Sequence, residues 1–387
     1  MAEVSEQALL SNFRKLTQLS SGQRLLPMLK ADAYGHGAEW VATRLYGQKQ
    51  LAGFGVATLP EGQMLRESLA ARFGDSKRSV PIVVFSGALP WTDDCGDFCD
   101  RFQLTPVLSS LEDWKLFHRR GWSRRLRFEL KFNTGMNRLG INLDALPVIR
   151  RDLIDLSRKG VSPAGILSHL AMAENPEHSL SVLQRSQFHS ILSELKPILP
   201  SSVDFHLANS AAIFQLSRWG LSGLTDRVRP GLSLYGIAPQ SGAAGARAQK
   251  LLTPVLSLSA PIVSVRKLAP GDQVGYGGRF VASKNMLIAI LGMGYADGLP
   301  RLWGQSENGE AVALIGGIRA KWVGAISMDL SAIAVSGSGS KWLRSGKRVL
   351  LLGPGIDPWV QAKAAGTIPY ELLTSLGARV QRMYGGS

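Results

Sequence analysis

Cysteine is nearly absent from this chain of 387 residues, which has two cysteines and no set of Cys and His residues at zinc spacing. The two thiols, Cys95 and Cys99 in DDCGDFCD, are typical of reduced thiols in a cytosolic protein. No apolar run reaches the roughly 18 residues of a membrane span. The N-terminal segment MAEVSEQALLSNFRK lacks a basic region followed by an apolar one, so no secretory signal is predicted. These absences predict a cytoplasmic protein without a metal site or a membrane partner.

Acidic residues are also scarce, with 29 Asp and Glu against 44 Lys and Arg and a formal net charge of +15. Such an excess favours contact with nucleic acid, and it also suits a protein that handles anionic small molecules. The densest basic run, HRRGWSRRLRF (118–128), spans the end of a predicted helix and the start of a predicted strand. A nucleic-acid site would instead want basic residues among exposed aromatics, or a recognition helix. We interpret the run as a solvated surface and predict no nucleic-acid partner, with a basic nucleic-acid-binding protein as the alternative from a different class. Its arginines are Arg119, Arg120, Arg124, Arg125 and Arg127.

Apolar residues make up 45% of the chain, enough for a large buried core. Their arrangement alternates between short apolar runs, typical of buried parallel strands, and longer amphipathic stretches typical of crossover helices. Eight such runs within about 235 residues favour a closed (β/α)8 TIM-type barrel over an open sheet. Pro27 interrupts the first run, where a ladder donor is lost. The eight runs are 25–30, 54–58, 81–86, 104–108, 126–132, 164–169, 203–207 and 226–229.

The pattern changes after residue 238. The stretch 239–250, PQSGAAGARAQK, is small and polar and is interpreted as a linker or an exposed loop. The segments beyond it alternate with period two between turn residues, which is typical of strands. The sequence therefore predicts an α/β architecture, with a barrel over 1–238 and a β-rich domain over 239–387.

Reactive side chains stand where the predicted barrel strands end. In such barrels the active-site groups gather at the rim formed by the carboxyl ends of the strands. The loops after the last two strands commonly bind phosphate, through backbone amides and a helix N-terminus. A lysine, arginines, a histidine and a phosphate site on one rim suggest pyridoxal phosphate held as a Schiff base. The residues at these ends are Lys30, Lys131 with Arg138, His169, Asn209 with Ser210, and Arg229 with Gly231.

Nine motifs follow one another over nearly the whole chain in the order found in bacterial alanine racemases. They are KADAYGHG (30–37), KFNTGMNRLG (131–140), LSHLA (167–171), HLANSAA (206–212), RPGLSLYG (229–236), VGYG (274–277), GYADGLPR (294–301), SMD (327–329) and GTIPYE (366–371). The chain thus resembles the fold-type III class of pyridoxal-phosphate enzymes. This resemblance implies a head-to-tail homodimer that interconverts L-alanine and D-alanine and supplies D-alanine for peptidoglycan.

The resemblance also implies two catalytic bases. Lys30 resembles the lysine that carries the cofactor and takes the α-proton of D-alanine, and Tyr276 resembles the base for L-alanine. Inversion of a stereocentre needs one base on each face of a planar carbanion. Because a free tyrosine has a pKa of about 10, Tyr276 needs cationic support, for which His169 and Arg229 are the expected residues.

Roles around the cofactor are carried over in the same way. Arg229 resembles the arginine that faces the pyridine nitrogen, to which a guanidinium can only donate. Arg138 resembles the contact to the substrate carboxylate and the cofactor phenolate. Lys131 resembles a lysine that many relatives carry in N-carboxylated form. The remaining implied contacts are Tyr34, Ser210, Gly231, Leu232 and Tyr370 around the phosphate, His169 and Phe85 near the ring, and Asn209, which orients the phosphate site.

Three further residues belong to the β-rich domain. Met328 is expected to offer a backbone amide to the substrate carboxylate, with Asp329 bracing its loop, and Tyr295 resembles an inner gate of the substrate channel. The family supplies Tyr276, Tyr295 and Met328 from the opposite protomer. The resemblance therefore implies that each domain of this kind completes the partner's active site.

Alternatives remain open at this level. From the residues alone, Ser210 could be a plain helix cap and His169 a structural histidine. A broad-specificity amino-acid racemase of the same fold is the first alternative function, and a decarboxylase of this fold is a lesser one. The chain also departs from the family pattern: its N-terminal strand looks short, Asn133 stands where many members have Asp, and Ser327 stands where many have Cys.

Overall fold

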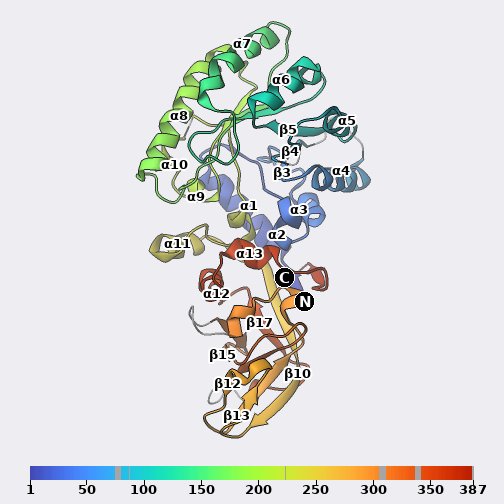
Figure 1. Ribbon diagram of the computed structural model, residues 1–387, viewed down its shortest axis with the longest axis vertical. Helices are drawn as coiled ribbons and strands as arrows, with labels where there is room; N and C mark the ends of the chain where they lie inside the picture. The colour runs from blue at the N-terminus through green and yellow to red at the C-terminus, as the bar shows by residue number, and fades with distance from the viewer. Residues whose placement is uncertain (75–79, 87, 223, 305–310, 336–340, 386–387) are drawn as a thin grey trace.

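The chain folds into two parts that lie end to end, one rich in helices and the other in strands (Figure 1). The computed structural model describes residues 1–74, 80–86, 88–222, 224–304, 311–335 and 341–385. Both chain termini lie near the junction of the two parts (Figure 1). The predicted fold class, an α/β barrel followed by a β-rich domain, is confirmed.

Eight short parallel strands of the described chain form the barrel, each within a predicted apolar run or overlapping its end. Strands β3 to β8 pair in sequence order, and β2 pairs with β9. Isolated bridges join Met28 to Gly55 and Asn209 to Arg229, so the β2–β9 pair is linked to both edges of the six-stranded sheet. The strands are β2 (Arg24–Leu25), β3 (Phe54–Val56), β4 (Ile82–Val84), β5 (Leu104–Leu108), β6 (Glu129–Lys131), β7 (Gly165–Leu167), β8 (Asp204–His206) and β9 (Arg227–Val228).

Helices connect all of these strands, as the amphipathic stretches predict. Side-chain caps begin several of them: the Thr58 hydroxyl accepts from the Glu61 amide before α4, and Ser110 does the same for Asp113 before α6. The helices of this part are α1 (Glu6–Leu19), α2 (Lys30–Gly35), α3 (Ala38–Leu45), α4 (Leu59–Phe73), α5 (Asp93–Arg101), α6 (Leu111–Arg119), α7 (Leu146–Ser157), α8 (Ser179–Leu195), α9 (Ser210–Ile213) and α10 (Leu216–Trp219). Short 3-10 turns lie at η1 (Trp122–Arg124), η2 (Leu143–Ala145), η3 (Lys196–Ile198) and η4 (Leu232–Tyr235).

The predicted first strand is regular over only two residues, and Pro27 is the reason. Proline has no N–H, so one ladder bond toward β3 is lost. The ladder resumes beyond it, where the Leu29 amide donates to the Gly55 carbonyl and the Met28 amide donates to the Pro230 carbonyl. The chain therefore keeps its place in the barrel up to Lys30.

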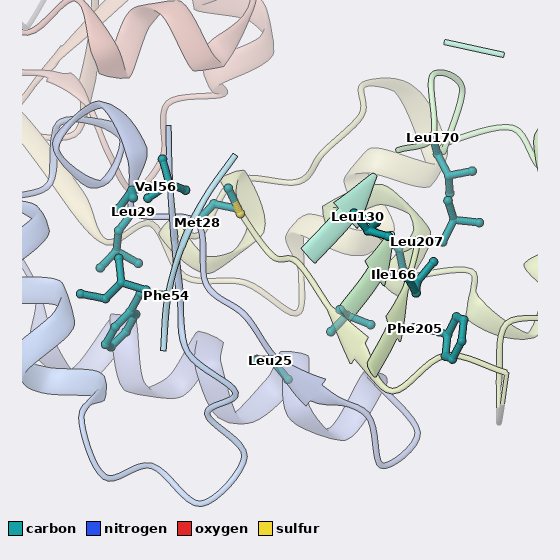
Figure 2. Packing of buried hydrophobic residues seen from close by; sticks show 14 of the residues in the cluster. Leu25, Met28, Leu29, Phe54, Val56, Leu130, Ile166, Leu170, Phe205 and Leu207 are labelled. Atoms are coloured by element: carbon teal, nitrogen blue, oxygen red, sulfur yellow. The ribbon is translucent and has the colours of Figure 1, made fainter. Parts of the chain in front are cut away.

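Apolar side chains from the strands and helices fill the barrel part (Figure 2). Phe54, Leu130, Ile166 and Leu207 are all fully buried. Full burial of such a side chain contributes about 1.5–3 kcal/mol. The packed core holds the strand ends in fixed positions, which is what a site on the rim requires.

The second part is a mainly antiparallel sheet in which β10 also pairs with β13, so that six strands close on themselves. A small hairpin, β11–β12, lies beside it. The strands are β10 (Leu256–Leu268), β11 (Gln273–Val274), β12 (Phe280–Val281), β13 (Met286–Leu291), β14 (Val312–Ile315), β15 (Ile318–Trp322), β16 (Ser331–Ala334), β17 (Arg348–Leu352) and β18 (Arg382–Tyr384). The helical elements are α11 (Gly242–Gln249), η5 (Tyr276–Gly278), η6 (Tyr295–Asp297), η7 (Arg301–Gly304), α12 (Pro358–Ala364) and α13 (Pro369–Thr374).

Several segments join the two parts. The N-terminal strand β1 (Ala2–Val4) has only three residues, and it lies in the second sheet between β10 and β18. Helix α13 lies beside α2 (Figure 1). The interpretation of 239–250 as a linker or loop is wrong over 242–249, where alanines with high helix propensity form α11.

Two further expectations concern the surface. The arginines of the run 118–128 are exposed, and Arg125 forms an ion pair with Asp100 at 2.5 Å. Among the described residues, no helix combines the length and the apolar character needed to cross a membrane.

Candidate active site

The predicted barrel residues converge on one cavity of about 690 Å3. Tyr370 joins them from α13 of the second part. A larger groove of about 920 Å3 lies on the second part, and its lining, which includes Lys267 and Trp322, holds no residue predicted for the site. The smaller cavity is therefore the candidate active site. The predicted residues that line it are Lys30, Tyr34, Phe85, Lys131, Arg138, His169, Asn209, Ser210, Arg229, Gly231, Leu232 and Tyr370.

Lys30 begins a turn with an uncommon backbone. The four residues after it, 31–34, have φ between 51° and 54° and ψ between 42° and 53°, which is the left-handed region. The left-handed conformation costs an L-amino acid roughly 1–2 kcal/mol per residue, so contacts with the surrounding residues must stabilise the turn. The result is that Lys30 and Tyr34 both face the cavity.

Buried His36 is one of the groups that hold this turn. Its Nδ1 lies 3.0 Å from the Ala33 carbonyl and 2.9 Å from the Tyr34 carbonyl, so Nδ1–H is the donor. Arg382, from β18, donates from Nε to the Gly35 carbonyl at 3.2 Å. The backbone of the lysine turn is thus fixed partly by the C-terminal strand.

Positive charge accumulates around Lys131. Burial, followed by the charges of Arg138, Arg229 and Lys30, lowers the pKa of its amine to about 8. The pKa of Lys30 is lowered as well, first by enclosure in the cavity and then by Arg138. Both amines therefore lose their protons more easily than ordinary lysines.

His169 lies among the same cations. Burial, followed by the charges of Arg229, Lys131, Arg138 and Lys30, holds its pKa well below the usual range. The imidazole is therefore neutral at neutral pH. The expected support of Tyr276 by His169 stays a prediction, because Tyr276 does not line this cavity in its own chain.

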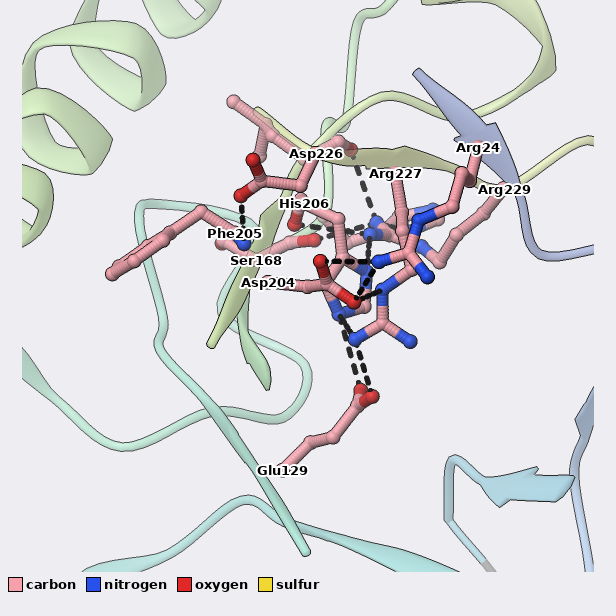
Figure 3. A network of polar contacts seen from close by, with 11 residues as sticks. Arg24, Glu129, Ser168, Asp204, Phe205, His206, Asp226, Arg227 and Arg229 are labelled. Atoms are coloured by element: carbon pink, nitrogen blue, oxygen red, sulfur yellow. Dashed lines mark hydrogen bonds and ion pairs between the residues drawn. The ribbon is translucent and has the colours of Figure 1, made fainter. Parts of the chain in front are cut away.

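Arg229 is anchored in a buried polar network (Figure 3). Its Nη1 donates to His206 Nδ1 at 2.7 Å, and its Nη2 donates to the Ser168 and Leu207 carbonyls at 2.6 and 3.0 Å. His206 Nδ1 accepts, so its proton resides on Nε2, which lies 3.1 Å from a Glu129 carboxylate oxygen. Glu129 is fully buried and forms an ion pair, at 2.6 Å, with Arg227.

These supporting residues were not predicted from the sequence. Glu129, His206 and Arg227 lie inside strands β6, β8 and β9 and point into the barrel. A charged residue within an otherwise apolar strand costs free energy unless it is paired. Glu129, His206 and Arg227, three ionisable residues within strands of one barrel, could therefore have revealed the network from the sequence.

Acid titration should expose this network. Burial lowers the pKa of His206 to about 3 and that of His36 to about 4. Unfolded histidines titrate near pH 6.5, so below that pH the unfolded chain binds more protons than the folded chain. We expect the free energy of unfolding to fall by about 1.4 kcal/mol per pH unit and per histidine between about pH 6.5 and 4.

Glu129 adds to this loss at lower pH. Arg227 and His206 hold the pKa of its carboxyl far below the usual range against the effect of burial. The contribution of ionised Glu129 to the free energy of unfolding is present above about pH 4.3 and is lost as the pH falls below that value. Urea denaturation at a series of pH values measures both effects. His206→Asn should reduce the slope and His189→Asn, on the exposed face of α8, should leave it unchanged; a slope equal in all three proteins would contradict the assignment.

Hydroxyl groups and a glycine form the end of the cavity that was predicted to hold phosphate. Ser210 Oγ accepts from the Gly231 amide at 2.9 Å, and Asn209 caps α9 by accepting from the Ala211 and Ala212 amides. A Cβ on Gly231 would lie 2.5 Å from the Tyr34 hydroxyl oxygen. A side chain at Gly231 would therefore require Tyr34 to move.

The loop that carries Arg138 is shaped by Asn133. Its side-chain oxygen accepts from the Gly135 and Asn137 amides, each at 3.1 Å, and its side-chain nitrogen donates to Asn137 at 2.9 Å and to Asn142 at 3.2 Å. A carboxylate cannot make the last two donations. An aspartate at this position would therefore bond differently to this loop.

Four predicted residues do not line this cavity. Tyr276 on η5 is 78% exposed, Met328 is 53% exposed, and Tyr295 on η6 is 41% exposed. The loops of Tyr295 and Met328 are adjacent, since the Tyr295 amide donates to the Ser327 carbonyl at 3.0 Å. Asp329 braces this region through an ion pair with Arg379 at 2.8 Å. Within one chain, Tyr276 is therefore not part of the cavity that contains Lys30.

The fold and the cavity together define a class of barrel enzyme with its reactive groups at the carboxyl ends of the strands. Its site contains the accessible lysine Lys30 and an end lined by the hydroxyls of Tyr34 and Ser210 beside Gly231. It also contains the guanidinium of Arg229, which the buried Glu129 holds in place through His206. Comparison with known proteins specifies the family.

Family descriptions match both parts of the chain: "Alanine racemase, N-terminal domain" over residues 4–239 and "Alanine racemase, C-terminal domain" over residues 255–384. The alanine racemase of Methylobacterium nodulans is 35% identical over 384 residues, which cover 97% of this chain and 94% of the relative. The chain therefore belongs to the alanine racemase family, and its enzyme class is that of a racemase, an isomerase.

Solved structures agree with this assignment. The biosynthetic alanine racemase of Pseudomonas aeruginosa has a TM-score of 0.83 and 31% identity, and the match covers 99% of this chain and 98% of that one. The alanine racemase of Bartonella henselae, solved with covalently bound pyridoxal phosphate, has a TM-score of 0.81 and 29% identity, with 99% of both chains covered.

Proposed function

We propose that this protein interconverts L-alanine and D-alanine with pyridoxal 5'-phosphate as cofactor, and that it supplies D-alanine for peptidoglycan in the cytoplasm. The observation that carries the proposal is the convergence of Lys30, Arg229, Tyr34 and Ser210 on one cavity. The names of the relatives support alanine as the substrate. The proposed division places the barrel in 1–238 and the β-rich domain in 239–387.

The residues of the cavity fit pyridoxal phosphate. Lys30 offers an amine for its aldehyde, and Tyr34, Ser210 and the backbone at Gly231 and Leu232 offer a phosphate site with Tyr370 beside it. Arg229 would face the ring nitrogen as a donor only, while His169, Phe85 and Asn209 would support the ring and the phosphate site. When bound, the cofactor supplies an electron sink that weakens the Cα–H bond of the amino acid.

The two bases act on opposite faces of Cα. Lys30 Nζ exchanges the proton on one face, and its lowered pKa keeps a larger fraction of the amine ready to accept a proton. Tyr276 Oη exchanges the proton on the other face. Arg138 binds the substrate carboxylate in a planar fork, and the Met328 amide binds the same group. Tyr295 would gate the channel and Asp329 would brace the Met328 loop.

A second copy of the chain would bring Tyr276 to this site. Tyr276, Met328 and Tyr295 are exposed on the second part, although the reaction needs them beside a cavity on the barrel. A head-to-tail homodimer resolves this because each second part then completes the cavity of its partner. Exposed apolar residues beside them, Val281 and Leu330, support burial of this face in the dimer.

Deuterium exchange tests the proposed reaction. Incubation of the purified protein with L-alanine in deuterium oxide should yield D-alanine carrying deuterium at Cα, measured by chiral chromatography with mass spectrometry. Formation of D-alanine without deuterium would contradict proton exchange at Cα. The same assay with lysine, arginine and serine tests the alternative of broad specificity, for which their rates would match that of alanine.

Lys131 should react with carbon dioxide to form a carbamate. Its pKa of about 8 leaves part of the amine unprotonated near neutral pH, and an anionic carbamate would relieve the repulsion among Lys131, Arg138 and Arg229. NMR of the protein equilibrated with isotope-labelled bicarbonate should show a carbamate carbon that Lys131→Arg removes, since arginine stays protonated. An identical signal in that variant would place the modification elsewhere.

A further inference from the structure

We propose that Glu61 is a positioning residue for Lys30, whose carboxylate holds the backbone directly after the lysine and keeps a negative charge near the lysine amine. The catalytic role of Lys30 rests on the proposed function, whereas the contacts of Glu61 do not. Glu61 lies in the first turn of α4 and is not among the residues that line the cavity.

The first observation is how the two carboxylate oxygens are used. Oε1 accepts from the Ala31 amide at 2.8 Å, and Oε2 accepts from the Ala57 amide at 2.7 Å and from the Thr58 amide at 3.1 Å. Both oxygens therefore already accept hydrogen bonds, and these bonds hold the side chain in one orientation. Glu61 ties the end of β3 and the start of α4 to the residue that follows Lys30.

The second observation is the backbone that this contact holds. Ala31 is the first of the four left-handed residues, a conformation that L-residues adopt only when their surroundings impose it. His36 and Arg382 hold the far end of this turn, and Glu61 holds its near end. The Ala31 amide is the point at which the direction of Lys30 is set, because it shares a peptide unit with the lysine.

The third observation is the balance of charge at the Lys30 amine. Arg138 and enclosure in the cavity lower the pKa of this amine, and Glu61 is the acid that raises it. The other titratable or charged groups that line the cavity are Tyr34, Lys131, His169, Glu174, Arg229 and Tyr370. Among the charges that act on the Lys30 amine, the Glu61 carboxylate thus opposes Arg138.

Three substitutions separate the two roles. Glu61→Gln removes the charge and leaves one acceptor oxygen for the three amides. Glu61→Asp keeps the charge but shortens the reach to Ala31, and Glu61→Ala removes both the charge and the acceptors. Glu67→Gln is the matched control, because Glu67 lies on the same helix and bonds to the Gln63 side chain at the surface.

Two measurements on the full chain, freed of cofactor by hydroxylamine and dialysis, report the roles separately. The pH profile of Lys30 acylation by acetic anhydride, quantified by peptide mass spectrometry, reports the basicity of the amine. Hydrogen–deuterium exchange of the peptide that contains Ala31 reports the backbone contact. Neither readout depends on racemase activity.

The acylation midpoint should move down by about 0.5–1 pH unit in Glu61→Gln and Glu61→Ala and stay unchanged in Glu61→Asp and in the control. Exchange at Ala31 should accelerate about tenfold or more in Glu61→Asp and Glu61→Ala and stay unchanged in Glu67→Gln. An unmoved midpoint in Glu61→Gln, or unchanged exchange in Glu61→Ala, would overturn the proposal. A wild-type protein that does not racemise alanine would refute the proposed function and leave these expectations intact.

Discussion

Lys30→Ala is expected to abolish the racemisation of alanine and the covalent attachment of pyridoxal phosphate together. The substitution removes both the amine that reacts with the aldehyde and one of two proton-transferring groups. Loss of one acid–base group alone costs about 10²–10⁴-fold, and loss of the covalent anchor adds to it. We therefore expect turnover to fall by about 10⁴-fold or more, measured as deuterium incorporation at Cα.

Controls for this prediction come from the same chain. Lys30→Arg keeps the positive charge but should be as inactive as Lys30→Ala, because a guanidinium neither reacts with the aldehyde nor gives up a proton readily. Lys49→Ala, at an exposed position outside the cavity, should retain full activity. Borohydride reduction of the loaded protein should label a peptide that contains Lys30. Substantial turnover in Lys30→Ala would remove the basis of the proposed mechanism.

Mixing two inactive variants should restore activity if the sites are shared between subunits. Chains carrying Lys30→Ala and chains carrying Tyr276→Phe each lack one base in both sites of their own dimers. In a mixed dimer, one site receives the intact Lys30 of one chain and the intact Tyr276 of the other. With random pairing about half of the dimers are mixed, so about a quarter of the wild-type activity should return.

The control for this experiment carries both substitutions in one chain. A doubly substituted chain mixed with a Tyr276→Phe chain offers no complete site in any dimer and should recover nothing. Size-exclusion chromatography with light scattering should show that every variant forms a dimer. No recovery from the first mixture, with exchange of subunits demonstrated by mass-tagged chains, would contradict a site shared between two copies.

The charge arrangement explains why these effects should be large. A lysine, two arginines and a second lysine meet at one rim, and Glu129, buried behind Arg229, compensates part of this charge through His206. Removal of one partner of a buried ion pair costs about 3–5 kcal/mol. Other orientations of the Arg229 side chain would disrupt this network and are therefore much higher in free energy. The rim is therefore preorganised for an anionic ligand.

Some parts of this arrangement followed from local sequence patterns. The order of the eight barrel strands and their helices was predicted correctly, because burial imposes a continuous apolar run on each strand and helical periodicity on each crossover. Once the strand ends were known, the convergence of Lys30, Lys131 and Arg229 followed from the geometry of a parallel barrel. The helix over 242–249 was missed because small residues lack a clear apolar period.

The sequence by itself determined the architecture, the family resemblance and the residues that gather at the rim, since these depend on short-range periodicity and on chain order. Only the tertiary structure decided that His169 is neutral, that Glu129 and His206 fix Arg229, and that the backbone after Lys30 is left-handed. It also decided that Tyr276 is separate from the cavity of its own chain. These properties arise from contacts between residues far apart in the sequence, and burial and charge at such contacts have no local signature.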